Sequence, residues 1–167
     1  MPRFVPSGTR RQAYKNFQTT HLQGGDNYAL LLVDSESPVT DDSPWVHLQN
    51  RPEDSWEKPH NARDEQCHLM VQCMETWLLA DRESLSLFFA QGFNENALPA
   101  SANLEDIAKE DLLNGLRNAT RACKRKASYG KGEHSFKLLA LIDPKKVSEA
   151  SPWAKRFIDA LKELAAR

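Results

Sequence analysis

The fourteen residues from His68 to Asp81, HLMVQCMETWLLAD, decide how this chain folds. They are mostly apolar, yet they carry Glu75 inside the apolar run and end at Asp81. A carboxylate is almost never buried without a partner, because its removal from water is costly. The pattern predicts a buried strand over residues 67–72 and the first turns of a helix over residues 74–81. We therefore expect Glu75 at a strand-to-helix junction, as a metal ligand, a general base or the partner of an internal arginine.

A second acidic cluster lies upstream, where the run LLLVDSE over residues 30–36 ends in Asp34 and Glu36. The apolar residues 28–33 are typical of a short strand buried on both faces. On a continuing strand, the two carboxylates would point to the same side. Ligands of open α/β sheets bind outside the carboxyl ends of the strands, and carboxylates there suit Mg²⁺. The cluster predicts a magnesium site, and the alternative is an acidic cap on the following loop.

The remaining pattern predicts a single α/β domain over residues 1–167. It would have a strand–helix–strand core within residues 1–90, a long polar loop at 35–66 and a helical part over 91–167. We expect a small, mostly parallel sheet with flanking helices. The other expected elements are a strand over 3–5, a turn over 23–27 and helices over 9–21, 84–89, 109–124, 135–142 and 153–166, with further helix starts at Asp143-Pro144 and Ser151-Pro152.

Composition excludes several classes of protein. With 40% hydrophobic and 27% charged residues, the chain is of ordinary globular type. No apolar run reaches the roughly 18 residues of a membrane span, and the first residues lack the apolar stretch of a signal peptide. Three cysteines cannot all pair and none lies in a CxxC motif, which indicates reduced thiols and a cytoplasmic location. The spacing of Cys67, His68 and Cys73 does not match a structural zinc site.

Positive charge gathers late in the chain. The net charge is −6 over residues 1–100 and +5 over residues 101–167. Lys131 precedes a predicted helix, whose first N–H groups and dipole favour anions. We expect Lys131, Arg121 and Lys124 to bind phosphate and the wider basic segment to contact nucleic acid. The alternative is a solvated helix end. The basic segment comprises Arg117, Arg121, Lys124, Arg125, Lys126 and Lys131.

Six blocks of the chain resemble the bacterial domain-of-unknown-function family 4276, and the resemblance runs nearly end to end. That family is in turn similar to Toprim-like proteins, including those encoded beside ATPases in phage-defence and restriction-associated loci. Toprim domains hold Mg²⁺ with a glutamate after a first strand and an Asp-x-Asp pair after a later one. The blocks are LLVDSESP from Leu31, HLMVQCMETWLLAD from His68, GFNENALP from Gly92, YGKG from Tyr129, HSF from His134 and ASP from Ala150.

The resemblance implies a Toprim-like, Rossmann-like α/β fold. Asp34 and Glu36 match the Asp-x-Asp pair, with a glutamate where the second aspartate is usual. Glu75 belongs to the Met-Glu block of the family. Members usually carry a further N-terminal strand that bears the first acidic residue, and this chain is expected to begin after it.

Two functions follow from the residues and the resemblance together. The first is a Mg²⁺-dependent nuclease or phosphotransferase linked to phage defence. Asp34, Glu36 and Glu75 would be its catalytic residues, and Asp34 and Glu36 its metal ligands. The second is a non-catalytic partner of an ATPase or of a nucleic-acid complex, or a homo-oligomer of this chain. Neither involves a membrane.

Overall fold

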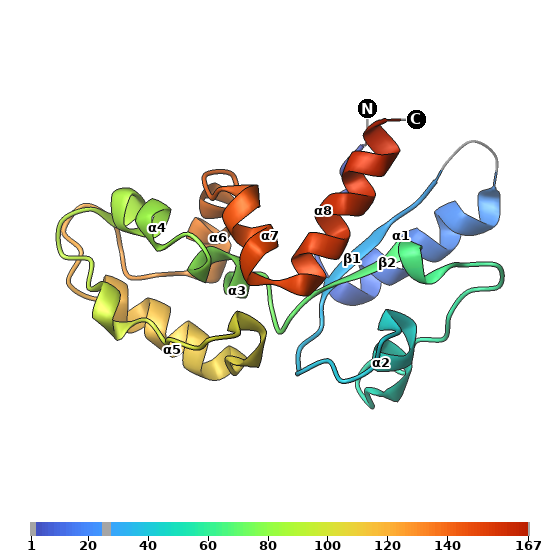
Figure 1. Ribbon diagram of the computed structural model, residues 1–167, viewed down its shortest axis with the longest axis horizontal. Helices are drawn as coiled ribbons and strands as arrows, with labels where there is room; N and C mark the ends of the chain where they lie inside the picture. The colour runs from blue at the N-terminus through green and yellow to red at the C-terminus, as the bar shows by residue number, and fades with distance from the viewer. Residues whose placement is uncertain (1–2, 25–27, 167) are drawn as a thin grey trace.

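The computed structural model describes residues 3–24 and 28–166, which form a mixed α/β structure that is mostly helical. Within these ranges eight α-helices accompany a two-stranded parallel sheet (Figure 1). None of these helices is both long and apolar enough to cross a membrane. In chain order the elements are α1 (Arg10–Gln23), β1 (Leu31–Asp34), α2 (Pro44–Asn50), β2 (Cys67–Met70), α3 (Glu75–Leu79), α4 (Arg82–Phe89), α5 (Lys109–Thr120), α6 (Lys131–Leu139), α7 (Pro144–Ala150) and α8 (Pro152–Ala165).

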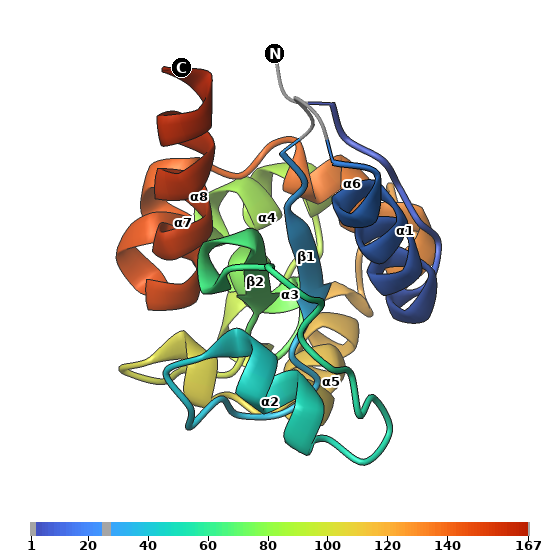
Figure 2. The same ribbon diagram turned by 90° about the vertical axis from the view of Figure 1, so that its right-hand side faces the viewer.

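The two strands lie side by side in parallel, with Leu31 opposite Cys67 and Asp34 opposite Met70. Most of their apolar side chains are buried because helices cover them: α1 packs on β1, while α2 and α8 pack on β2 (Figure 2). Parallel strands end at the same edge of a sheet. The carboxyl end of β1 therefore lies beside the chain that leaves β2 and enters α3.

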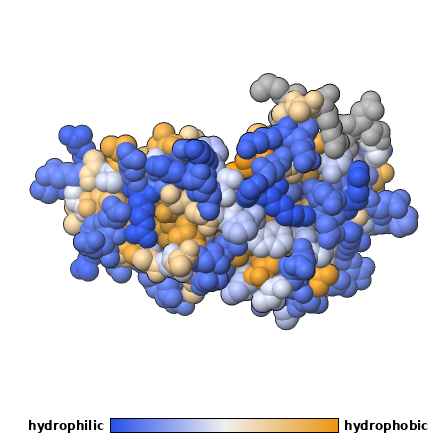
Figure 3. All heavy atoms as spheres, viewed as in Figure 1, coloured by the Kyte–Doolittle hydropathy of each residue, from blue (hydrophilic) through white to orange (hydrophobic). Residues whose placement is uncertain are grey.

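Two hydrophobic cores flank this edge. One surrounds the sheet and includes Tyr14, Trp45 and Leu48. The other lies among the later helices and includes Phe89 and Leu116. In Figure 1 the strand ends and α3 lie between the two parts, and the space-filling view is notched there (Figure 3). Side chains from both parts can therefore meet where the strands end.

Several helix boundaries follow the capping chemistry expected from the sequence. Thr9 caps α1 and accepts a hydrogen bond from the Gln12 N–H at 3.2 Å. Ser151 caps α8, and proline occupies an early position in both α7 and α8. Proline is tolerated there because the first N–H groups of a helix have no partner within the helix.

The prediction of a strand over residues 3–5 is wrong, and with it the predicted strand–helix–strand core. Phe4 and Val5 are 74% and 59% exposed and pair with no strand. An extended segment without a partner strand makes no ladder of hydrogen bonds. The parallel pair is formed by β1 and β2, with α2 in the connection between them.

The predicted long polar loop over residues 35–66 is only partly irregular. It contains α2, which has Pro44 near its first position, and a 3₁₀ turn over Asp64–Gln66. Trp45 and Leu48 pack α2 against the sheet core. Their burial stabilises a helix that the proline-rich sequence of this segment did not predict. Part of the predicted turn, residues 25–27, lies outside the described residues.

Candidate functional site

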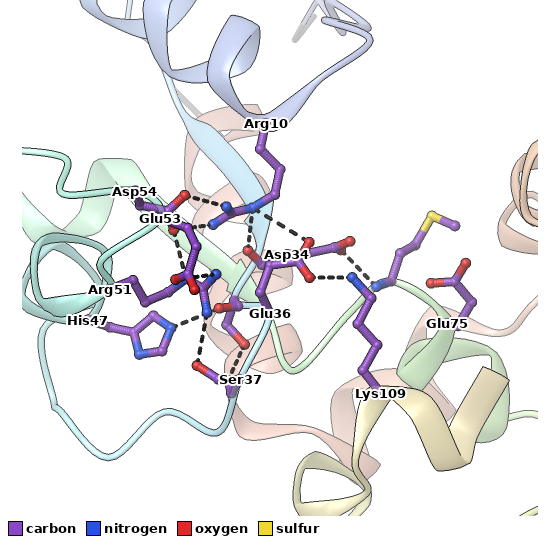
Figure 4. Close-up of polar contacts among 12 residues, drawn as sticks. Arg10, Asp34, Glu36, Ser37, His47, Arg51, Glu53, Asp54, Glu75 and Lys109 are labelled. Carbon is purple, nitrogen blue, oxygen red and sulfur yellow. Dashed lines mark hydrogen bonds and ion pairs between the residues drawn. The ribbon is translucent and has the colours of Figure 1, made fainter. Parts of the chain in front are cut away.

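The site begins where β1 ends. The backbone pairing with the neighbouring chain runs past the strand, since the Glu36 N–H donates to the Gln72 carbonyl at 2.8 Å. Glu36 has a φ of 66°, however, which is left-handed and uncommon for a residue with a side chain. The strand alternation therefore stops before Glu36. The Glu36 carboxylate pairs with Lys109 (Figure 4), whereas that of Asp34 pairs with Lys131.

Asp34 is held at one oxygen and open to a cation at the other. Its Oδ1 accepts a hydrogen bond from the Met74 N–H at 2.8 Å, and its Oδ2 lies 3.5 Å from Lys131 Nζ. Burial raises the pKa of Asp34, and the nearby carboxylates of Glu75 and Glu36 add to the rise. Lys131 and the Met74 N–H lower this pKa without cancelling the increase.

Glu75 is completely buried and, like Asp34, has one oxygen in a hydrogen bond and the other near Lys131. Its Oε1 accepts a hydrogen bond from the Tyr129 hydroxyl at 3.0 Å. Its Oε2 has no hydrogen-bond partner and lies 3.5 Å from Lys131 Nζ. The Tyr129 oxygen also lies 2.9 Å from Ser135 Oγ. Burial and the Glu75 charge raise the pKa of Tyr129, so its hydroxyl remains a hydrogen-bond donor. Glu75 is thus fixed in position with one oxygen unsatisfied.

Lys131 joins the two carboxylates. Its side chain is half exposed, and its ammonium lies 3.5 Å from both Asp34 Oδ2 and Glu75 Oε2. Burial lowers the pKa of Lys131, but the charges of Glu75 and Asp34 outweigh it and raise the value overall. The ammonium therefore stays charged at neutral pH.

Glu36 forms a second branch of the cluster. Its carboxylate pairs with the Lys109 ammonium, and Arg10 Nε lies 3.9 Å from Glu36 Oε1. Arg10 also donates to the Asp34 carbonyl at 2.9 Å and to Asp54 Oδ2 at 2.8 Å. A second guanidinium, that of Arg51, donates to the same Asp54 oxygen at 2.8 Å. Arg10 therefore ties the end of β1 to the loop that follows α2 (Figure 4).

The three cations of the cluster share a position in their helices. Arg10, Lys109 and Lys131 are the first residues of α1, α5 and α6. A cation at the amino end of a helix opposes the helix dipole and needs a nearby anion. Three helix amino ends therefore meet the three carboxylates. The sequence reasoning missed Lys109 and Arg10 as members of the cluster. The signal that could have found them is a cation at the first position of a helix.

The donor atoms of Asp34 and Glu75 fit a hard divalent cation such as Mg²⁺. Mg²⁺ prefers oxygen and is usually held by one or two carboxylates together with water and substrate phosphates. Burial and the same two carboxylates raise the pKa of the neighbouring Cys73 to about 12, so its thiol stays neutral. Among residues 3–24 and 28–166, no group of three or more His, Cys, Asp or Glu side chains could hold a metal ion.

The unsatisfied oxygen of Glu75 supports the same fit. Across the described ranges, three buried side-chain polar atoms lack a hydrogen bond: Glu75 Oε2, Thr76 Oγ1 and Trp77 Nε1. A buried atom of this kind costs free energy, so its presence calls for an explanation. Of the three atoms, Glu75 Oε2 carries negative charge and shares a cation with a second carboxylate.

The other predicted site residues lie elsewhere. Arg121 and Lys124 are exposed, just after α5. Within the described part of the chain, no hydrogen bond or ion pair joins either side chain to the acidic cluster. His68 packs against the Phe157 ring at 5.2 Å, and its Nε2 lies 3.0 Å from the Glu65 carbonyl. Burial lowers the pKa of His68 to about 4, so it is a neutral core residue.

One comparison with known proteins gives a match. A family model described as "Domain of unknown function (DUF4276)" matches residues 2–162. No curated protein and no solved structure matches the chain.

Proposed function

The chain belongs to the DUF4276 family, and from that premise we propose that it is a Toprim-like, Mg²⁺-dependent enzyme that cleaves or transfers phosphodiester groups of nucleic acids. One observation carries the proposal: two carboxylates at the strand ends, the half-buried Asp34 and the fully buried Glu75, each turn one oxygen toward the same cation, Lys131. The resemblance of the family to Toprim-like proteins of phage-defence loci supports this reading.

Asp34 and Glu75 would hold the metal. The sequence paired Asp34 with Glu36, but the geometry favours Glu75, because Glu36 is engaged by Lys109 and Arg10. When bound, Mg²⁺ supplies a Lewis acid that polarises the phosphoryl group. Glu36 is the most exposed of the three carboxylates, at 24% of its side chain, and would act indirectly by holding Lys109 and Arg10 at the edge of the site.

The substrate would be held through its phosphates. Lys131 lies at the amino end of α6, where a cation and backbone N–H groups together favour an anion. Residues 112–132 carry six Lys and Arg side chains and no Asp or Glu. Arg121 and Lys124, both exposed, would contact phosphates of a longer nucleic acid away from the reacting group.

A second function is favoured by a separate observation. The three carboxylates of the cluster already face three cations, so the network is compensated as it stands. Such a network would also suit a non-catalytic subunit, in which the acidic residues fix the junction between the two cores. The basic segment would then dock nucleic acid or an ATPase.

A cleavage assay separates the two functions. Single- and double-stranded DNA and RNA are incubated with the protein in Mg²⁺, in Mn²⁺ and in chelator, using wild type, Asp34→Asn and Asp159→Asn. Asp159 serves as a control, because among the described residues its ion-pair partners are Lys155 and Lys162 on the exposed face of α8. Metal-dependent cleavage that is lost in Asp34→Asn and kept in Asp159→Asn supports the enzyme. Equal cleavage by Asp34→Asn rejects the mechanism, and no cleavage under any condition favours the partner.

A further inference from the structure

The acidic pair has the form of a prepared cation site. Asp34 uses Oδ1 to accept from the Met74 N–H, and Glu75 uses Oε1 to accept from the Tyr129 hydroxyl. The remaining oxygen of each carboxylate faces one point, 3.5 Å away, where Lys131 Nζ lies. Each carboxylate is thus fixed by a neutral donor and leaves its other oxygen to a shared cation.

The ammonium satisfies this position only in part. An N⁺–H···O⁻ hydrogen bond is about 2.7–2.9 Å long, and both contacts of Lys131 Nζ are 3.5 Å. Glu75 Oε2 accordingly has no hydrogen bond although it is completely buried. A small divalent cation approaches carboxylate oxygens more closely than an ammonium does and carries twice the charge.

Lys131 is also free to leave. Its side chain is 50% exposed, and it is the first residue of α6, so its chain can turn into solvent without disturbing the helix. Lysine has four rotatable methylene carbons and a compact, strongly hydrated charge. By contrast, the two carboxylates are 12% and 0% exposed and cannot follow it.

We propose that the Lys131 ammonium stands in for the divalent cation in the metal-free protein, and that it is displaced into solvent when the cation binds between Asp34 and Glu75. The inference rests on the proposed function and deepens it, since it assigns Lys131 two successive positions. In the first, Lys131 compensates one half-buried and one fully buried carboxylate. In the second, its released charge faces the phosphate that approaches α6.

Metal affinity of charge-removing variants tests the exchange without any nucleic acid. Mn²⁺ binding is followed by the electron paramagnetic resonance signal of free Mn²⁺ in titrations of wild type, Lys131→Met, Lys155→Met and Glu75→Gln. Removal of a competing cation should strengthen binding, so Lys131→Met is expected to bind Mn²⁺ about tenfold more tightly than wild type. Lys155→Met is the control, because Lys155 also pairs with a carboxylate, Asp159, but lies on α8 outside the acidic cluster. It should bind as wild type does, and Glu75→Gln should lose binding.

A second measurement uses wild type alone and so does not depend on the folding of a variant. Lysine amines are methylated reductively with and without Mg²⁺, with choline chloride balancing ionic strength, and the modified residues are identified by mass spectrometry. Modification of Lys131 should rise severalfold with Mg²⁺, while that of Lys109 stays constant.

The outcomes distinguish this inference from the proposed function. Unchanged or weaker Mn²⁺ binding in Lys131→Met, or unchanged modification of Lys131, overturns the exchange even if the protein cleaves nucleic acid. Tighter binding in Lys131→Met and release of Lys131 establish the exchange even if no cleavage is found. Absence of Mn²⁺ binding by wild type overturns it as well.

Discussion

Glu75 and Asp81 are buried carboxylates of one sequence block, on either side of α3, and their surroundings differ completely. Asp81 accepts hydrogen bonds from the Ser84 N–H at 3.3 Å, the Ser84 hydroxyl at 2.8 Å and the Asp143 N–H at 3.0 Å. Lys146 Nζ lies 2.7 Å from it. Glu75 has one hydrogen bond and shares one half-exposed cation with Asp34.

The difference separates a structural carboxylate from a candidate ligand. Asp81 caps α4 and ties it to α7, and both of its oxygens are satisfied. Lys146, the Asp143 N–H and Ser84 outweigh burial and lower the pKa of Asp81 to about 2. A buried carboxylate that stabilises a fold accepts several hydrogen bonds from neighbouring N–H and O–H groups. Glu75 lacks these donors, so stability alone does not explain it.

The sharpest test of the comparison is Glu75→Gln. Glutamine keeps an oxygen for the Tyr129 hydroxyl but loses the charge that holds the metal. A bound metal lowers the reaction barrier by several kcal/mol, so metal-dependent cleavage should fall about a thousandfold. The free energy of unfolding should change less than in Asp81→Ala, because glutamine keeps the Tyr129 hydrogen bond and the half-exposed Lys131 ammonium keeps Asp34 and water as partners. Cleavage rates and urea unfolding measure the two effects. Full activity in this variant would contradict the assignment of Glu75 as a ligand and remove its functional difference from Asp81.

Asp81→Ala should show the opposite pattern. The change removes a helix cap and leaves the Asp143 N–H without its acceptor, which together should lower the free energy of unfolding by about 3 kcal/mol. Urea unfolding measures the loss. Cleavage per folded molecule should stay at the wild-type level, and a loss of cleavage at low temperature, where the variant is folded, would contradict the structural role.

Tyr129→Phe should weaken the site without removing a ligand. Its hydroxyl fixes Glu75 Oε1, and loss of a group that orients a ligand costs about 10- to 100-fold in metal affinity or activity. Mn²⁺ titration measures this effect. Wild-type affinity in the variant would show that Glu75 needs no orientation.

The smallest expected effect is the pH dependence carried by Asp81. Its pKa is about 2 in the fold against an ordinary value of 3.8, so the folded state binds fewer protons between these values. The stabilisation is therefore present above about pH 4 and is lost as the pH falls towards 2. In urea unfolding at a series of pH values, the gap between wild type and Asp81→Asn should narrow over this window. A constant gap would contradict the assignment.

The sequence predicted the parts of the site that depend on local pattern. It placed Asp34 at the end of a buried strand and Glu75 at the start of a helix, because apolar runs fix where strands and helices lie. It did not predict that Lys109 pairs with Glu36, 73 residues away in the chain, because that contact depends on how the two cores pack. The false strand over residues 3–5 shows the same limit: its apolar pattern is suitable, but it pairs with neither β1 nor β2.

The most direct test of the central claim is a crystal of this protein soaked in MnCl₂ and measured at the manganese absorption edge. The account predicts one anomalous peak between Asp34 and Glu75, at carboxylate-ligand distance from both, with the Lys131 side chain turned into solvent. A peak at Glu36 and Lys109, or an undisturbed Lys131 between the two carboxylates with no peak, would contradict it.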